Sequence, residues 1–125
     1  METTLTLTEK DREELQEFVR TVSERYGDVL DRIILFGSGA RGMLGKESDL
    51  DVLVVLKRRS LKVSKEIRRI ATDLLLLYGR YLSVKTLSES MYRELQALET
   101  PFMLHVSHDG KTLWKKAEDK GQEAS

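Results

Sequence analysis

Two aspartates separated by one residue stand at the start of an apolar segment near the middle of the chain. Asp49 and Asp51 flank Leu50, and the remaining residues to Leu56 are all apolar. Side chains alternate between the two faces of a β-strand, so both carboxylates are expected on one face. Two neighbouring carboxylates repel each other, and a divalent cation relieves that repulsion. The pair suits Mg²⁺, which commonly takes one or two carboxylates together with substrate phosphates.

An Asp-x-Asp pair also occurs at strand ends that are simply solvated, so the pair alone does not establish a metal site. The residues upstream favour the metal site. The apolar run Ile33 to Phe36 stops abruptly at Gly37-Ser38, and the linker that follows contains three more glycines and Arg41. We interpret this as a strand, a phosphate-binding turn and a second strand. A short helical turn is expected around residues 38–43, with its exposed N–H groups facing bound phosphate.

The same glycines also spell G-x-G-x-x-G, the dinucleotide-binding fingerprint, from Gly37 to Gly42. That fingerprint requires a helix after the glycines, within a βαβ unit of about 30 residues. Only the six residues Met43 to Ser48 precede the next predicted strand, whereas a parallel crossover needs a dozen or more. The two strands are therefore expected to pair antiparallel, which excludes the fingerprint.

Ten residues separate Gly37-Ser38 from Asp49-x-Asp51. With Arg41-Gly42 inside it, this spacing resembles the minimal nucleotidyltransferases of the DNA polymerase β superfamily. The resemblance extends from the helix before Ile33 to the strand near Trp114. It implies that Gly37 and Ser38 hold nucleotide phosphates and that Asp49 and Asp51 bind Mg²⁺ and serve catalysis. Arg41 is expected either to contact phosphate or to pair with a neighbouring acid.

One feature departs from the resembled family, in which a third carboxylate on the neighbouring strand supports the metal site. The predicted third strand, Tyr81 to Leu87, contains no acid, and Glu89 lies just beyond it. The pattern therefore favours nucleotide and metal binding over efficient catalysis.

The resemblance leaves three functions open. The first is a Mg²⁺-dependent enzyme that moves a nucleoside monophosphate from ATP or another NTP to a hydroxyl, on a partner protein. The second is an antitoxin or regulatory nucleotide-binding module that pairs with a HEPN-type toxin. The third is a nucleotide-binding domain without turnover. A separate partner chain is expected because the family's small members lack a substrate-binding domain and this chain is equally short.

The expected fold class is α/β, with a small mixed nucleotidyltransferase-like sheet and flanking helices that cover mainly one face. Capping residues, apolar spacing and helix breakers indicate the remaining elements. They are helices at Thr8–Tyr26, Ser60–Tyr78, Glu89–Leu98 and from Pro101 to before Gly110, and strands at Arg32–Phe36, Leu50–Leu56, Tyr81–Leu87 and Lys111–Trp114.

Surface features are predicted from the same periodicity. The acids between Glu9 and Asp31 are interpreted as a solvated face, and Leu77 is assigned to the core stripe of its helix. A basic run, Lys57 to Arg69, contains seven Lys and Arg residues and one acid. It is either a solvated helix face or a docking surface for an anionic partner, beside the proposed site. His105 and His108 are expected at the surface or in packing, not as metal ligands.

Composition bounds the remaining possibilities. The chain has 125 residues, a formal net charge of zero and no cysteine. We expect one domain over residues 1–114 and a disordered polar tail over 115–125. A neutral chain is not drawn globally to nucleic acid or to a membrane, and no apolar run is long enough to span one. The absence of cysteine fits a reducing, cytoplasmic location. Homo-oligomerisation is left open.

Overall fold

The computed structural model describes residues 7–37 and 49–117. In chain order its elements are α1 (Glu9–Tyr26), a 3-10 turn (Gly27–Val29), β1 (Leu30–Phe36), β2 (Leu50–Leu56), α3 (Leu61–Tyr78), β3 (Leu82–Ser88), α4 (Glu89–Leu98), α5 (Pro101–Asp109) and β4 (Lys111–Lys115). These bounds agree with the sequence-based elements to within two residues. The helical turn expected around residues 38–43 and the final residues of the tail lie outside the described residues.

The four strands form one mixed sheet in the order β3-β2-β1-β4. β1 is antiparallel to both β2 and β4, whereas β2 and β3 are parallel and are joined by the crossover helix α3. The antiparallel pairing of β1 and β2 confirms that the linker is too short for a crossover. The α/β fold with a small mixed sheet and flanking helices is therefore confirmed.

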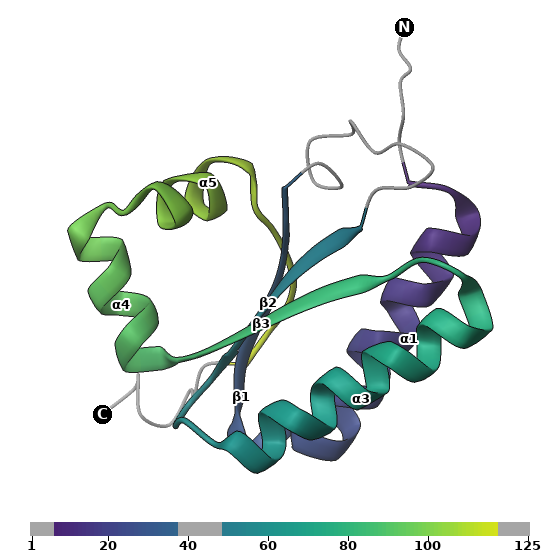
Figure 1. The fold of residues 1–125 in the computed structure, drawn as a ribbon. Coiled ribbons are helices and arrows are strands. Elements are labelled where there is room, and N and C mark those ends of the chain that lie inside the picture. The colour runs from purple at the N-terminus through teal and green to yellow at the C-terminus, as the bar shows by residue number, and fades with distance from the viewer. Residues whose placement is uncertain (1–6, 38–48, 118–125) are drawn as a thin grey trace, which may run out of the picture.

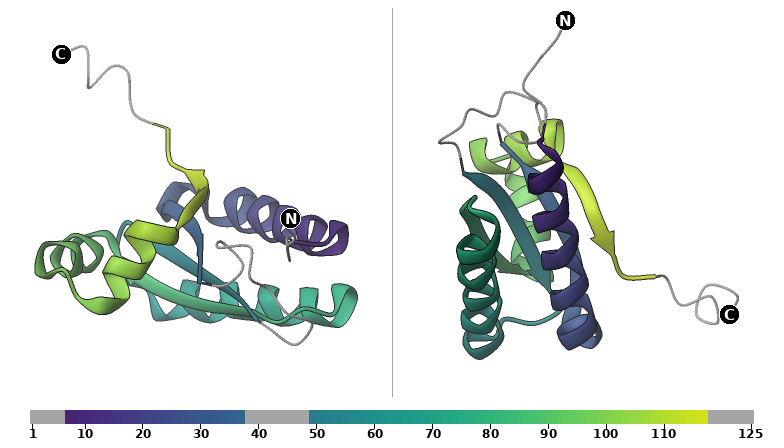
Figure 2. Two further views of the ribbon diagram at one scale, coloured as in Figure 1. Left: turned by 90° about the horizontal axis from the view of Figure 1, so that it is seen from above. Right: turned by 90° about the vertical axis from the view of Figure 1, so that its right-hand side faces the viewer.

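Helices cover both faces of the sheet (Figure 1). α1 and α3 lie side by side against one face, as Figure 2 shows from two directions, and α4 and α5 lie against the other. The expectation that helices cover mainly one face was wrong. Helices cover both faces because β2 is buried on both sides from Val52 to Leu56 and therefore needs apolar partners on both faces.

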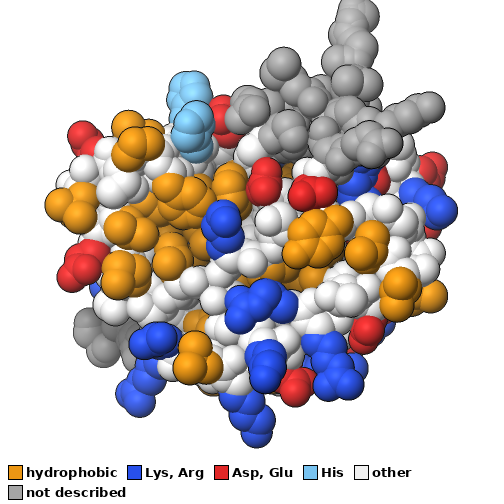
Figure 3. Space-filling model, viewed as in Figure 1, with side chains coloured by type: hydrophobic (Ala, Val, Ile, Leu, Met, Phe, Trp, Pro, Cys, Tyr) orange, Lys and Arg blue, Asp and Glu red, His pale blue; other side chains and the backbone are white. Residues whose placement is uncertain are grey.

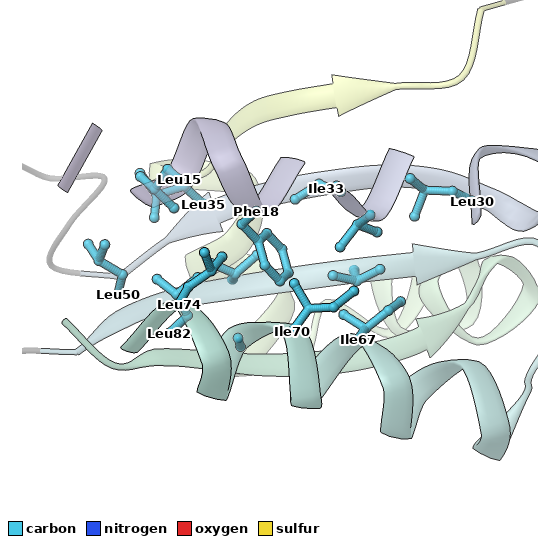
Figure 4. Packing of buried hydrophobic residues seen from close by; sticks show 14 of the residues in the cluster. Leu15, Phe18, Leu30, Ile33, Leu35, Leu50, Ile67, Ile70, Leu74 and Leu82 are labelled. Atoms are coloured by element: carbon cyan, nitrogen blue, oxygen red, sulfur yellow. The ribbon is translucent and has the colours of Figure 1, made fainter. Parts of the chain in front are cut away.

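The larger core cluster lies between the sheet and the helices α1 and α3 (Figure 4). Phe18 of α1 and Ile67 of α3 are fully buried there. The assignment of Leu77 to this core was wrong, because its side chain is 74% exposed. The smaller cluster, on the other face, joins Leu53 of β2 to Tyr92 of α4 and to residues of α5.

Side-chain caps fix where each helix begins. The hydroxyls of Thr8, Ser60, Ser88 and Thr100 each accept a hydrogen bond from a backbone N–H in the first turn of α1, α3, α4 and α5. Such caps satisfy donors that have no partner within the helix. Gly79 ends α3 in the left-handed region, at φ +98°. No helix in the described part of the chain is long and apolar enough to cross a bilayer.

The basic run does not lie beside the candidate site. Lys57 follows the C-terminal end of β2, and Asp49 precedes its N-terminal end, so β2 separates them by its whole length. From there the run continues on the exposed face of α3. Figure 3 shows Lys and Arg side chains gathered along the lower edge of the molecule, where Figure 1 places α3.

Candidate functional site

The strand β2 determines where the two aspartates lie. Leu50, between them, is fully buried against the α1 and α3 side, and its N–H donates to the carbonyl oxygen of Tyr81 at 3.0 Å. Alternation then places Asp49 and Asp51 on the opposite face. Asp49 is exposed and Asp51 is half-buried. Two carboxylates thus lie at one end of the sheet, on the face that α4 and α5 partly cover.

Gly37 lies directly against one of these carboxylates. Its φ is +76°, in the left-handed region, and the preceding residue, Phe36, pairs with Asp51 across the two strands. A Cβ atom at Gly37 would be 2.4 Å from Oδ2 of Asp51, which is closer than such atoms approach each other. Backbone conformation and close approach therefore both require glycine here. The predicted phosphate-binding turn begins in contact with the predicted metal ligand.

The other two predicted nucleotide-binding residues, Ser38 and Arg41, lie outside the described residues. Of the predicted set, the structure therefore brings together Gly37 and Asp51, with Asp49 beside them. Sequence spacing had linked the turn to the aspartate pair. The contact itself follows from the antiparallel register.

The neighbouring strand β3 carries no carboxylate on this face. Ser83 pairs with Asp51, and Lys85 pairs with Leu53. Glu89 follows Ser88, which pairs with Leu56 at the far end of β2, so its backbone position is at the opposite end of the sheet. Among residues 7–37 and 49–117, no three acids or histidines are grouped closely enough to hold a metal ion.

The residues present nevertheless fit a magnesium ion that binds together with a nucleotide. The carboxylates of Asp49 and Asp51 lie on one face of the sheet and are hard oxygen donors, the kind of ligand that magnesium prefers. Magnesium is usually held by one or two carboxylates, with phosphate oxygens and water completing its coordination. Two carboxylates match that requirement when the ligand is a nucleoside triphosphate.

Sequence reasoning missed a buried ion pair at the same end of the sheet. The guanidinium of Arg80 donates to Oδ1 of Asp11 at 3.1 Å and to Oδ2 at 3.0 Å. Burial by itself would raise the pKa of Asp11, but hydrogen bonds from Arg80 and Thr8 hold that pKa below its ordinary value. Arg80 immediately precedes Tyr81, which accepts the Leu50 hydrogen bond. The pair therefore ties α1 to the strands that hold the aspartates.

Glu14, one helical turn after Asp11, is fully buried. Neither of its carboxylate oxygens has a hydrogen-bond partner in the described structure. Burial raises the pKa of Glu14 to about 7, and the charge of Asp11 adds to that rise. The interpretation of all the α1 acids as a solvated face was therefore wrong for Asp11 and Glu14. Their spacing from Phe18 was the available signal, because residues three, four and seven positions apart share a helix face.

Known proteins resemble this chain in sequence and in fold. A protein of Methanocaldococcus jannaschii, described as a candidate protein adenylyltransferase, is 39% identical over 87 residues, which cover 66% of this chain and 88% of that protein. A candidate nucleotidyltransferase from Sulfolobus solfataricus has a crystal structure that matches with a TM-score of 0.53 and 19% identity, over 92% of this chain and 91% of its own. A toxin–antitoxin structure with AMP-PNP matches with a TM-score of 0.52 and 20% identity, over 87% and 78%.

The sequence model of one family also matches most of the folded part of the chain. It covers residues 15–99, from the middle of α1 to the end of α4, and it includes both aspartates and the glycine turn. The chain belongs to the nucleotidyltransferase domain family.

Proposed function

We propose that this protein is a magnesium-dependent nucleotidyltransferase that moves a nucleoside monophosphate from ATP or another NTP to a hydroxyl on a partner protein. The observation that carries the proposal is the contact between Gly37 and Asp51. This contact supports the proposal because Gly37, where the proposed phosphate-binding turn begins, is adjacent to a carboxylate that would hold the cation accompanying the phosphates.

Each residue has a role in this proposal. Gly37 and Ser38 bind phosphate oxygens through their backbone and hydroxyl groups, and Arg41 adds a charged contact. Asp49 and Asp51 hold magnesium, which supplies positive charge to the phosphate oxygens. Transfer joins the acceptor oxygen to the α-phosphorus. It breaks the bond from that phosphorus to the bridging oxygen, which leaves with its electron pair as pyrophosphate, and the hydroxyl proton passes to solvent.

One comparison supports a protein acceptor. The similar protein of M. jannaschii is described as a candidate protein adenylyltransferase, and this chain spans 88% of its length. In this proposal a second chain carries the acceptor hydroxyl.

A second candidate is a regulatory nucleotide-binding module, such as an antitoxin that pairs with a HEPN-type toxin. The observation that favours it is the absence of a third acid near Asp51 in the described structure. With two carboxylates, nucleotide and metal are held, while no further acid among the described residues beside Asp51 is available to activate the attacking hydroxyl. In this case the protein binds Mg²⁺–ATP and its partner without turnover.

Calorimetry with Mg²⁺–ATP tests the shared part of both candidates. The expected result is binding by the wild type and its loss in Asp51→Asn, while Asp73→Asn, at an exposed position on α3, binds normally. Equal affinity in the wild type and Asp51→Asn would refute the site.

Incubation with labelled ATP and a copurifying helical partner then separates the candidates. Label transferred to the partner supports the enzyme, and partner binding without transfer supports the regulatory module.

A further inference from the structure

The strand next to the aspartates carries a lysine on their face of the sheet. β3 runs parallel to β2, with Ser83 opposite Asp51 and Lys85 opposite Leu53. Directly paired residues point to the same face of a sheet, as do residues two apart on one strand. Lys85 therefore shares the face of Asp51. Strand spacing and rise place its Cα about 8 Å from that of Asp51.

Lys85 has no competing partner in the described structure. The other basic residue on this face of β1 to β3 is Arg32, whose Nε donates to Oδ2 of Asp31 at 2.7 Å and whose guanidinium lies 5.1 Å from the centre of the Tyr92 ring. Lys85 is exposed and forms no hydrogen bond or ion pair with any described residue through its side chain. Of these two cations, only Lys85 is available to a ligand.

The charge of Lys85 changes what this strand can bind. A carboxylate beside Asp51 would recruit a second cation, whereas an ammonium group repels cations and attracts phosphate oxygens. A nucleoside triphosphate carries several negative charges, of which one magnesium ion neutralises two. A lysine one strand away from the metal ligands can balance part of the remainder.

We propose that Lys85 binds phosphate oxygens of the nucleotide whose magnesium ion is held by Asp49 and Asp51. This inference rests on the proposed function and extends it to a residue on β3. Lys85 then recognises the β- and γ-phosphates by charge, and the site discriminates between a nucleoside triphosphate and a monophosphate. In this respect the ammonium group of Lys85 replaces a second metal ion as the source of positive charge.

Lys85 also has a simpler structural role open to it. β3 is an edge strand, and lysines on edge strands prevent pairing with other chains. That role predicts that removing the charge promotes aggregation and leaves nucleotide affinity unchanged. Lys115 provides a matched control, because it is an exposed lysine on β4, the strand at the opposite edge of the sheet.

The test compares Lys85→Met, Lys85→Arg and Lys115→Met with the wild type by calorimetry. For Lys85→Met we expect Mg²⁺–ATP affinity to fall about tenfold, as for the loss of one charged contact, and AMP affinity to stay unchanged. Lys85→Arg should retain most of the ATP affinity, and Lys115→Met all of it. The affinity of Lys85→Met should also depend less on salt, because one charge pair is missing.

The outcomes separate the inference from the proposed function. Wild-type binding of Mg²⁺–ATP with the same affinity in Lys85→Met overturns the role of Lys85 and leaves the proposed function standing. An equal loss of ATP and AMP affinity also overturns it, because recognition of the outer phosphates must discriminate between them. Failure of the wild type to bind Mg²⁺–ATP overturns both. Circular dichroism of Lys85→Met checks that the substitution leaves the fold intact.

Discussion

The α-carbon of Gly37 lies so close to the carboxylate of Asp51 that no other residue fits at this position without displacing the carboxylate. The two residues are separated by a linker in sequence, yet a Cβ atom on the first would be 2.4 Å from Oδ2 of the second. The contact arises because β1 and β2 pair antiparallel, with Phe36 opposite Asp51. Gly37 and the carboxylate of Asp51 are therefore direct neighbours in the fold.

Replacing Gly37 with alanine should weaken nucleotide binding strongly and lower the stability of the fold only moderately. The left-handed backbone, at φ +76°, costs a residue with a Cβ roughly 1–2 kcal/mol, and the added carbon displaces the Asp51 carboxylate. Mg²⁺–ATP affinity should fall at least tenfold in calorimetry. Gly27→Ala is the matched control, because Gly27 has a right-handed helical backbone and a Cβ atom added there would meet no other atom within 4 Å. Equal ATP affinity in both variants would contradict the contact.

Replacing Arg80 with methionine should strongly destabilise the fold. It leaves the carboxylate of Asp11, which is only 4% exposed, without its ionic partner and beside Glu14. Breaking a buried pair by removing one partner costs about 3–5 kcal/mol. Arg93→Met is the control, because Arg93 pairs with Glu89 on the surface of α4 with a side chain that is 74% exposed, and such pairs contribute about 1 kcal/mol or less. Urea unfolding measures the free energy of unfolding of both variants. Similar losses in the two variants would contradict the larger contribution of the buried ion pair.

Glu14 should make the protein less stable as the pH rises towards neutrality. Its pKa is about 7 when folded and 4.5 as the reference value. A raised pKa in the folded state means that stability is fully present below about pH 4.5 and is lost progressively up to about pH 7. The loss is on the order of 3 kcal/mol, since each pKa unit is worth about 1.4 kcal/mol. Urea unfolding between pH 4.5 and 8 measures it.

Glu14→Gln should remove most of that pH dependence, because glutamine does not ionise. The variant should be more stable than the wild type at pH 8 and similar to it at pH 4.5. Glu13→Gln, at the adjacent exposed position, should follow the wild-type profile. A wild-type stability that stays flat over this pH range would show that Glu14 is solvated or paired in solution.

The sequence predicted the fold better than it predicted the charges. The short linker required antiparallel strands, and the apolar run of β2 required cover on both faces, although helices were expected mainly on one. Asp11 and Glu14 were assigned to solvent because a helix-wheel pattern treats acids as outward-facing. The ionic partner of Asp11 is Arg80, which is 69 residues further along the chain. The spacing of the two acids from Phe18 could have indicated that they are buried, whereas a partner so distant in the sequence leaves no local signal.

In the candidate site, too, local sequence pattern predicted some features, and others depend on the tertiary arrangement. Alternation placed Asp49 and Asp51 on one face, and the glycine turn was predicted from its position between two strands. The register of β3 against β2 could not be derived, because it is set by the length and packing of α3. That register is what identifies Ser83 as the residue opposite Asp51 and places Lys85 two residues further along.

The basic run should matter to a partner and not to the fold. Its side chains are exposed and none forms an ion pair with a described residue. Reversal of Arg58, Arg59, Lys62 and Lys65 to glutamate should leave the circular dichroism spectrum unchanged and weaken binding of an anionic partner protein, with a smaller salt dependence. Mg²⁺–ATP affinity is the internal control, since the run lies at the other end of β2. Partner binding with unchanged salt dependence would show that the run is merely a solvated face.

Ser83→Asp should supply the third carboxylate that the described structure lacks. Ser83 is half-buried and lies directly opposite Asp51 on the neighbouring strand, where paired side chains are close enough to share a metal ion. Three carboxylates hold a cation without help from phosphate, so magnesium affinity in the absence of nucleotide should rise about tenfold or more. Without magnesium the variant should be less stable than the wild type, because a like charge has been added beside Asp51.

Ser90→Asp is the control, because Ser90 is an exposed residue of α4, beyond the far end of β3. Magnesium titration followed by thermal unfolding gives both quantities. Unchanged metal affinity in Ser83→Asp would show that the face of β3 opposite Asp51 is not part of the metal site, and any gain in transfer onto a partner would show that the missing acid limits turnover.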